Sequence, residues 1–183
     1  MVAILLGTGF EEMEALCPCD CLRRVGVEVK LISVEGLPVV TGAHGIAVAA
    51  DGSLADLDAA DVELVMLPGG MGGVRAISAS RQALDLVQTI YDTGRYVAAI
   101  CAAPTILAAL HITDGRQATC FPGMEEEMAD ARMCMDAPVV QDGNVITSTA
   151  AGTAMEFALH LVSLLKGEDA ARELKESLVY HCR

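Results

Sequence analysis

The sequence predicts an α/β fold in which a doubly wound, mostly parallel sheet is sandwiched by helices. Short apolar runs alternate with longer segments of helical character. The connections are short, and no linker, repeat or low-complexity segment interrupts the 183 residues. Trp is absent and aromatic residues make up 3% of the chain, so the core must consist of Ala, Val, Leu, Ile and Met, which suits helices on a parallel sheet. We expect a single domain that spans residues 1–183.

The first elements follow from apolar runs and glycine stops. Val2–Leu6 is a short apolar run ended by Gly7 and is typical of a buried strand. A helix is expected over Glu12–Val25, because Gly26 stands where a helix C-terminal glycine belongs. Alternating apolar residues predict a second strand over Val27–Ser33.

The middle of the chain continues this alternation. Pro38–Asp51 is rich in β-branched residues and Gly, which predicts a small hairpin. Val62–Leu67 predicts a third core strand, and Ser80–Thr93 a helix closed by a glycine. Only Cys101 separates the next expected strand and helix, which are Tyr96–Ile100 and Ala102–Leu110.

The last third opens with a segment that shows no clear pattern, Gly115–Gly143, and then returns to a strand at Asn144–Ser148. Thr153 and Glu156 have the spacing of a capping box, which would open a helix. The two closing helices are expected over 153–166 and 168–178.

Charge and cysteine content restrict the function. A net charge of −13 disfavours nucleic acid and anionic membrane surfaces as partners. The start of the chain lacks signal-peptide features, and the longest apolar run, 97–110, is too short to span a bilayer. We therefore expect a cytoplasmic protein. Its odd number of cysteines without Cys-x-x-Cys spacing indicates free thiols and no metal site; the seven are Cys17, Cys19, Cys21, Cys101, Cys120, Cys134 and Cys182.

Cys101 is the first candidate for chemistry. A strand that passes straight into a helix must turn sharply and exposes the side chain at the turn, as in a nucleophile elbow. The small neighbours Ala99, Ala102 and Ala103 fit such a turn. The helix N-terminus would favour a thiolate, and the amides of Ala102 and Gly70 would hold an oxyanion. The alternative is a buried core cysteine.

The segment that follows the first strand contains three acids. Gly7 and Gly9 suggest a dinucleotide fingerprint, but Glu12 occupies the place of the third glycine and would repel a pyrophosphate. One of the acids could instead point into the cleft and stay protonated beside the thiol. The alternative is that Glu11, Glu12 and Glu14 are solvated charges in the first turn of a helix.

Two other segments have open interpretations. The glycines of Pro68-Gly69-Gly70-Met71-Gly72-Gly73 would let the backbone approach a ligand, and an oxyanion contact is favoured over a phosphate loop or a plain flexible turn. Cys17 and Cys21 would share a helix face beside Cys19. They could hold a soft metal or sense oxidants, but no fourth ligand is evident, and small apolar side chains of a helix are the simpler interpretation.

Together these segments resemble the ThiJ/PfpI superfamily, in particular its small parkinsonism-linked deglycase branch. The resemblance covers nearly the whole chain and includes Gly9-Phe10-Glu11-Glu12-Met13-Glu14, Ala98-Ala99-Ile100-Cys101-Ala102-Ala103-Pro104, Thr147-Ser148, Gly152-Thr153 and Glu156-Phe157-Ala158. It implies a flavodoxin-like fold of the class I glutamine amidotransferase type that forms homodimers. It also implies that Cys101 is the reactive thiol, that Glu14 is its protonated partner, and that Gly69, Gly70 and Ala102 line the site.

The chain departs from its relatives where a histidine base would be expected. Some relatives have His directly after the cysteine, where this chain has Ala102, and others have His before a Pro, where this chain has Phe121. Basic residues near the pocket are replaced by His44 and Thr149. His44 is expected at the cleft mouth or in a turn. Proton transfer should therefore fall mainly to Glu14.

The resemblance leaves two classes of function open, and we favour an enzyme. Relatives are described as glyoxalases, as deglycases and as oxidation-responsive chaperones. In the first class, Cys101 attacks an α-oxoaldehyde or a glycated adduct without metal or organic cofactor, and Glu14 carries the proton. In the second, the chain is a redox-responsive stress protein whose Cys101 is oxidised. A dimeric scaffold that has lost its activity is the third alternative.

Overall fold

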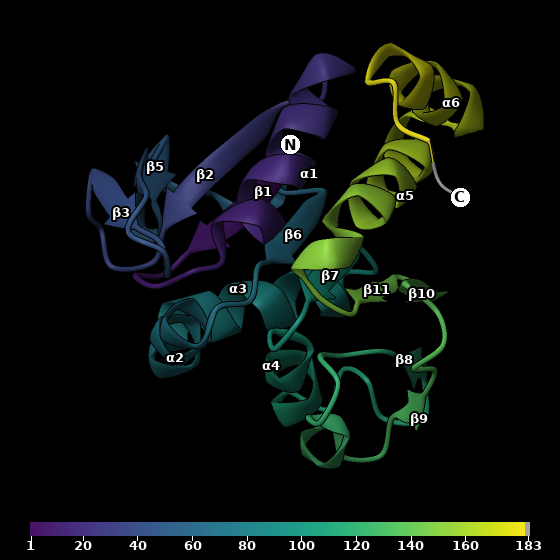
Figure 1. Ribbon diagram of the computed structural model, residues 1–183. Helices are drawn as coiled ribbons and strands as arrows, with labels where there is room; N and C mark the ends of the chain where they lie inside the picture. The colour runs from purple at the N-terminus through teal and green to yellow at the C-terminus, as the bar shows by residue number, and fades with distance from the viewer. Residues whose placement is uncertain (182–183) are drawn as a thin grey trace.

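The computed structural model describes residues 1–181, which build a central seven-stranded sheet (Figure 1). Its strands are β1 (Val2–Leu6), β2 (Val29–Ser33), β5 (Gly52–Ser53), β6 (Leu64–Leu67), β7 (Tyr96–Ile100), β10 (Val139–Asp142) and β11 (Val145–Ser148). Their spatial order is β10-β11-β7-β6-β1-β2-β5, and only β10 pairs antiparallel with its neighbour. The main parallel strands β2-β1-β6-β7-β11 thus follow the flavodoxin-like order 2-1-3-4-5. This confirms the predicted fold class.

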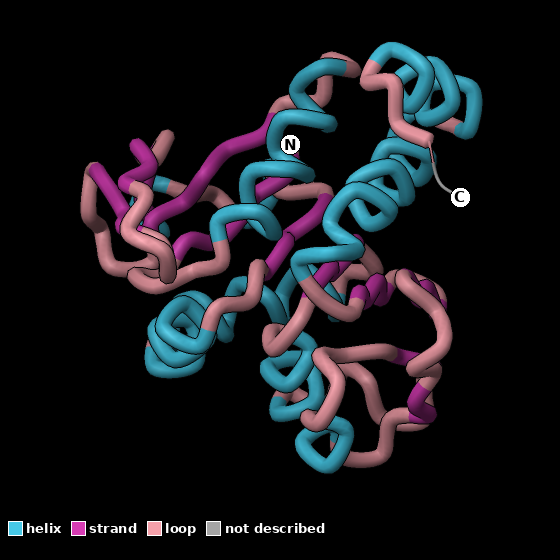
Figure 2. The backbone as a smooth tube through the Cα atoms, viewed as in Figure 1, coloured by secondary structure: helices cyan, strands magenta, loops and turns pink. Residues whose placement is uncertain are grey.

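Helices cover both faces of the sheet (Figure 2). They are α1 (Glu12–Arg24), α2 (Met71–Ala79), α3 (Arg81–Asp92), α4 (Pro104–Ala109), α5 (Ala154–Lys166) and α6 (Glu168–Ser177). Alternate residues of β1 supply both cores, because successive side chains of a strand point to opposite faces. Ile4 packs with α1, α5 and α6, whereas Leu5 packs with α2, α3 and α4. The two buried clusters therefore hold the sheet, and the carboxyl ends of its strands, in a fixed position.

The predicted hairpin is present as β3 (Val39–Thr41) paired antiparallel with β4 (Ala47–Ala49). Backbone hydrogen bonds tie it to the segment before α1, since the amide of Gly9 donates to the carbonyl of Thr41 at 2.8 Å. The amide of Ala43 donates to the carbonyl of Phe10 at the same distance. The tip of the hairpin therefore lies beside the first turn of α1.

Three features of the structure differ from the sequence-based expectation. The glycine segment does not continue as a loop, because α2 begins at Met71. The irregular segment contains β8 (Gln117–Ala118), β9 (Arg132–Met133) and the antiparallel edge strand β10. The predicted capping box is wrong: the Thr153 hydroxyl donates to the carbonyl of Ala150 at 2.8 Å, and the Glu156 carboxylate accepts a hydrogen bond from Tyr180 at 2.5 Å. Thr153 is thus engaged in a local turn and Glu156 in a tertiary contact.

Candidate active site

The candidate site lies at the carboxyl ends of β1, β6 and β7. The sheet order reverses between β1 and β6, which is where open α/β sheets bind ligands. Three segments meet there: residues 7–14 after β1, residues 68–73 after β6, and Cys101 after β7. The topology thus brings together the segments that the sequence analysis singled out.

Cys101 occupies the sharp turn after β7. Its φ of +67° lies in the left-handed region that non-glycine residues rarely adopt. The turn is fixed on both sides, because the amide of Cys101 donates to the carbonyl of Ser148 at 3.0 Å and the amide of Phe121 donates to the carbonyl of Cys101 at 2.8 Å. Ala102 and Ala103 are buried, so a larger side chain would not fit there. The sulfur lines an open pocket rather than the core, which answers the alternative of a buried cysteine.

Helix α4 contributes less to this turn than the sequence suggested. It begins at Pro104 rather than Ala102 and has six residues, so its terminus is displaced from the sulfur and its dipole is small. The amides of Ala102 and Gly70 provide the local donors, since both lower the pKa of the Cys101 thiol. These are the two amides that the sequence analysis named.

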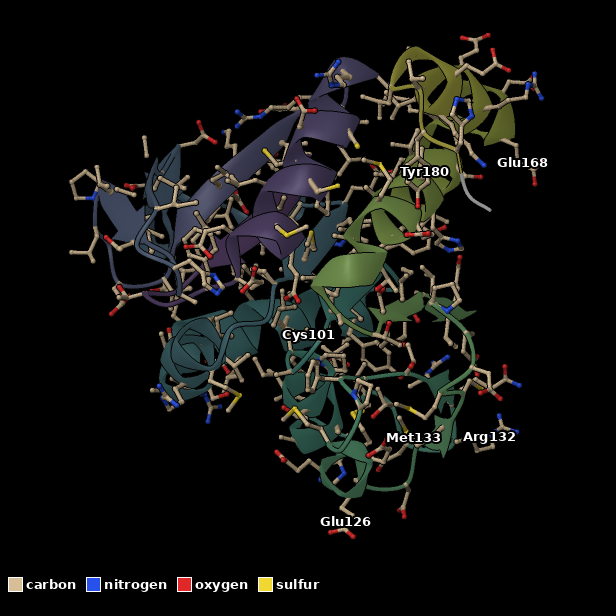
Figure 3. All side chains as sticks on the ribbon, viewed as in Figure 1. Cys101, Glu126, Arg132, Met133, Glu168 and Tyr180 are labelled. Atoms are coloured by element: carbon tan, nitrogen blue, oxygen red, sulfur yellow. The ribbon has the colours of Figure 1, made fainter. Side chains whose placement is uncertain are left out.

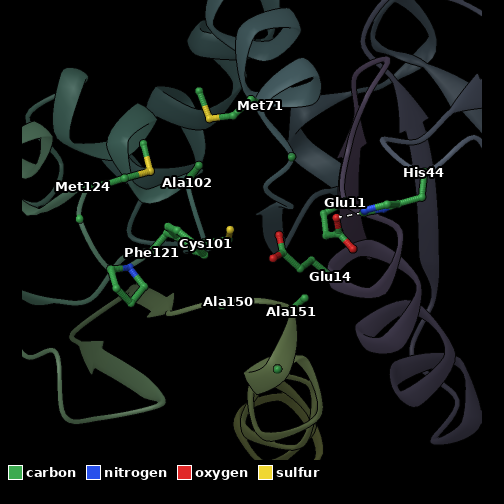
Figure 4. Close-up of a pocket in the computed structure, with 14 residues that line it drawn as sticks. Glu11, Glu14, His44, Met71, Cys101, Ala102, Phe121, Met124, Ala150 and Ala151 are labelled. Carbon is green, nitrogen blue, oxygen red and sulfur yellow. Dashed lines mark ion pairs between the residues drawn. The ribbon is translucent and has the colours of Figure 1, made fainter.

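Glu14 faces Cys101 from the first turn of α1 (Figure 4). Its side chain is fully buried, and Oε2 accepts a hydrogen bond from the amide of Gly69 at 2.8 Å. Within residues 1–181, Oε1 has no hydrogen-bond partner. A methyl group added at Gly69 would lie 2.6 Å from Oε2 of Glu14 and 3.2 Å from Sγ of Cys101. Gly69 therefore leaves the space in which carboxyl and sulfur approach each other.

Burial decides the protonation of this pair. It raises the pKa of Glu14 to about 7, against the hydrogen bonds with Cys101 and Gly69, which lower it. Burial and the Glu14 carboxylate raise the pKa of the Cys101 thiol to about 12, against the amides of Ala102 and Gly70. A free thiolate with a depressed pKa, which the sequence analysis expected, is therefore not what the site provides. Between these two values the pair holds one proton, which resides on the sulfur while the Glu14 carboxyl is ionised.

The glycine segment is packed rather than flexible. A Cβ at Gly70 would lie 2.5 Å from the carbonyl oxygen of Gly9, and a Cβ at Gly72 would lie 2.7 Å from that of Thr8. Gly70 also has a φ of +81°, which aims its amide toward the sulfur. The glycines thus allow the backbones after β1 and β6 to touch, and this contact lets α2 begin at Met71.

Glu11, Glu12 and His44 form a second polar group at the pocket mouth. His44 Nδ1 lies 2.9 Å from Oε2 of Glu12 and 3.4 Å from Oε2 of Glu11. The Glu12 carboxylate also accepts the amides of His44 and Ile46, at 2.8 and 3.4 Å. Their ligand atoms lie within 4.8 Å of one another, so the group could in principle hold a cation. The sequence analysis did not identify it, because it depends on the position of the hairpin.

A pocket of about 660 Å³ opens above Cys101. Besides the polar groups, apolar side chains and small residues form its walls: Met71, Ala102, Phe121, Pro122, Met124, Ala150 and Ala151. His44 does line the pocket, whereas Thr149 hydrogen-bonds to Thr153 at 3.2 Å and is not among the lining residues. Met71, Met124 and the alanines carried no signal in the sequence, because apolar residues in such segments normally indicate packing.

The chain is similar in sequence and fold to several known proteins. The Drosophila melanogaster protein dj-1beta is 36% identical over 177 residues, which cover 96% of this chain and 95% of the relative. Its crystal structure superposes with a TM-score of 0.94 over 99% of this chain and 98% of that one. A protein named a deglycase from Pyrococcus abyssi is 32% identical and covers 90% of this chain and 99% of its own length. A Toxoplasma gondii DJ-1 structure, described as oxidized, has 29% identity and a TM-score of 0.93, over 99% and 98% of the two chains.

No helix among residues 1–181 combines the length and the apolar character needed to cross a membrane. The family model described as DJ-1/PfpI matches residues 1–164, and the similarity to the Drosophila melanogaster relative and its structure agrees with that match. The chain therefore belongs to the DJ-1/PfpI family.

Proposed function

We propose that this chain is a cofactor-independent enzyme of the glyoxalase or deglycase type, which acts on α-oxoaldehydes or their adducts through Cys101 and Glu14. The observation that carries the proposal is the fully buried Glu14 carboxyl, which faces the sulfur with a pKa raised to about 7. Such a pair can pass a proton in either direction near neutral pH. The deglycase name of the Pyrococcus abyssi relative supports the same class of substrate.

In the first step, the proton moves from Cys101 to Glu14 while the sulfur attacks the aldehyde carbon. A carbon–sulfur bond forms, and Glu14 passes its new proton to the carbonyl oxygen, which gives a hemithioacetal and restores the Glu14 carboxylate. The amides of Gly70 and Ala102, which already point at the sulfur, stabilise the negative charge on that oxygen during the attack.

In the second step, the Glu14 carboxylate removes the hydrogen of the former aldehyde carbon as a proton, which leaves an enediolate. Glu14 then delivers this proton to the neighbouring carbon, while the hydroxyl proton of the first carbon passes to the oxygen of the second. This internal redox step oxidises the first carbon to a thioester and reduces the second to an alcohol. Water then cleaves the thioester, which releases a hydroxy acid and restores the Cys101 thiol. Methylglyoxal plus water thus gives lactate, with no external oxidant or reductant.

The pocket suits a neutral carbonyl compound. None of the described residues that line it is Lys or Arg, whereas Glu11 and Glu14 contribute negative charge. A substrate that carries a carboxylate would therefore be repelled, and an uncharged oxoaldehyde or a neutral adduct would not.

The experiment is an assay of lactate formation from methylglyoxal by the pure protein, the Cys101→Ala variant and the Glu14→Gln variant. We expect product with the wild type only. Absence of lactate from the wild type, or equal rates in the wild type and Cys101→Ala, rejects the proposal. The Cys134→Ser variant is the matched control, because Cys134 is a partly exposed thiol outside the pocket.

The second candidate function is a redox-responsive stress protein. Cys101 is accessible from the pocket and two amides point at its sulfur, so a peroxide could convert it through a sulfenate to a sulfinate, with loss of water at each step. The oxidized state of the Toxoplasma gondii relative is consistent with this. The test is mass measurement after mild peroxide treatment, and we expect oxygen to add first at Cys101. First addition at Cys17, Cys19 or Cys134 would reject this function.

We also propose a homodimer and a cytoplasmic location. The apolar side chains of Met13 and Ile46, on the first turn of α1 and the hairpin, are 59% and 53% exposed, which suggests a protein contact surface. Sedimentation should give a dimer in the wild type and a monomer in the double variant Met13→Lys, Ile46→Lys. Free thiols throughout residues 1–181 fit a reducing compartment.

A further inference from the structure

Three sulfur atoms gather between α1 and α5, away from the pocket. Cys17 and Cys21 are four residues apart and so share one face of α1. Sγ of Cys21 lies 3.9 Å from Sδ of Met155 on α5, and Cys17 and Met155 both pack against the buried cluster that contains Cys21. Figure 3 shows sulfur atoms along the facing sides of the two helices. None of these side chains takes part in the chemistry proposed above.

We propose that Cys17, Cys21 and Met155 form a binding site for the soft monovalent cation Cu(I). Thiolate and thioether sulfur are the protein ligands that such an ion prefers. With metal–sulfur bonds of about 2.3 Å, ligands of a trigonal site stand about 4 Å apart. The separation of 3.9 Å between Cys21 and Met155 already matches this spacing. Two of the three ligands are thus held near their required distance by the packing of α1 on α5.

The donor set distinguishes Cu(I) from zinc. A structural zinc ion takes four ligands from cysteine, histidine and carboxylates. Among residues 1–181, the only cluster of three or more such ligands is Glu11, Glu12 and His44, so a fourth ligand of that kind does not join the two cysteines. A site of two thiolates and one thioether is complete for a trigonal monovalent ion and incomplete for zinc.

Binding requires both thiols to lose their protons. The metal displaces both protons as its bonds to the two sulfur atoms form. The loaded site carries one net negative charge and releases two protons, with no change in oxidation state.

The ion can reach the site from the surface. Cys21 is 1% exposed and forms the floor, whereas Cys17 and Met155 are only partly buried. Entry therefore requires side-chain rotation rather than separation of the helices.

The test is an anaerobic titration with Cu(I), delivered from a chelator of known affinity, of the full chain carrying Cys101→Ser to remove the pocket thiol. We expect one equivalent to bind, with ultraviolet absorption from sulfur-to-copper charge transfer. Cys17→Ser and Cys21→Ser should each weaken binding by on the order of 100-fold, and Met155→Leu, which keeps the volume, by about tenfold. Cys19→Ala, on the same helix, is the matched control and should change affinity by less than about twofold.

Cys17→Ser is the primary variant, because a partly buried position tolerates serine, and circular dichroism verifies that each variant is folded. No bound Cu(I) in the Cys101→Ser chain overturns the site. So does unchanged affinity in Cys17→Ser or Met155→Leu, or an equal loss in Cys19→Ala.

Discussion

Glu12 and Glu14 lie two residues apart in the first turn of α1, and both are almost completely buried, at 4% and 0% exposure. Their environments nevertheless move the pKa in opposite directions. Burial raises that of Glu14 to about 7. Burial acts in the same direction on Glu12, but hydrogen bonds from the His44 ring and from the amides of His44 and Ile46 outweigh it, so the pKa of Glu12 is lowered.

The difference shows that hydrogen-bond donors can outweigh the effect of burial on the ionisation of a carboxyl group. Both oxygens of Glu12 accept hydrogen bonds, and the turn of the hairpin closes so tightly around the carboxyl that a Cβ at Gly42 would lie 2.4 Å from its Cδ. The Glu14 carboxyl accepts a hydrogen bond from the amide of Gly69 and faces the Cys101 thiol. Its Oε1 has no hydrogen-bond partner among the described residues. One acid is therefore a fixed charge that holds the hairpin, and the other is equipped to exchange a proton.

The largest expected effect is a difference in activity between variants of the two acids. Glu14→Gln removes the exchangeable proton and should lower kcat/KM for methylglyoxal by about 10² to 10⁴-fold. Glu12→Gln is the matched control and should leave the rate within a few-fold. In the wild type, kcat/KM should rise with pH through about 7, where Glu14 becomes ionised. Equal losses in the two variants would contradict the distinction.

Gly69→Ala tests the close approach of carboxyl and sulfur. The added methyl would lie 2.6 Å from Oε2 of Glu14 and 2.8 Å from Cβ of Cys101, so both side chains must move apart. We expect activity to fall by about 100-fold and stability by about 1–3 kcal/mol, measured by steady-state kinetics and urea unfolding. Gly52→Ala, whose nearest contact would be Ile32 at 3.8 Å, should change neither.

The pH dependence of stability tests the raised pKa of Glu14. The folded state keeps the Glu14 proton up to about pH 7, whereas the unfolded chain releases it near 4.5. The stabilisation from the neutral acid is thus complete below about 4.5 and is lost as the pH rises to about 7. This loss is about 3 kcal/mol. Urea unfolding of the wild type minus Glu14→Gln should show this decline, and a flat difference would contradict it.

Glu12→Gln should affect stability rather than rate. Because the pKa of Glu12 is lowered, its ionised form stabilises the fold above the ordinary value of 4.5, and this stabilisation is lost as the pH falls through the folded-state pKa. Loss of the charge-assisted hydrogen bonds should cost about 1–2 kcal/mol at pH 7. The deficit should shrink toward pH 4. An equal loss of stability in Glu12→Gln at pH 7 and at pH 4 would contradict an ionised Glu12.

The smallest effect concerns the His44 ring. Its hydrogen bond with Glu12 and the charges of Glu11 and Glu12 raise its pKa above 6.5. The protonated His44 ring therefore stabilises the folded state below pH 6.5. This stabilisation is lost as the pH rises through the raised pKa of His44. In Glu12→Gln, NMR titration of His44 should give a pKa lower than in the wild type but still raised by Glu11, at 3.4 Å. An unchanged pKa of His44 in Glu12→Gln would show that Glu12 does not influence the ring.

Local sequence predicted the parts of the site that depend on neighbours in the chain. The turn at Cys101 follows from a strand and a helix with only small residues between them. The parallel sheet follows from the alternation of strands and helices, whereas its flavodoxin-like order rested on the resemblance to a family. The partnership of Glu14 with Cys101 rested on the resemblance to a family, because local spacing left Glu11, Glu12 and Glu14 equivalent.

The rest depends on contacts between distant segments. The hairpin supplies the amides that distinguish Glu12 from Glu14, and nothing in residues 11–14 indicates this. Helix α2 begins with two glycines after Met71, which local propensity disfavours. It forms because those glycines let it pack against residues 8–10. Glu156 has capping-box spacing from Thr153, but the distant Tyr180 engages its carboxylate instead.

The left-handed backbone of Cys101 has an evolutionary consequence. For any residue other than glycine, this conformation costs about 1–2 kcal/mol. Drift without selection for the thiol would therefore tend to replace Cys101 with glycine, which gains stability at once. A lineage that keeps a cysteine in this backbone conformation bears a continuing disadvantage in folding, and its persistence would itself be a record of use.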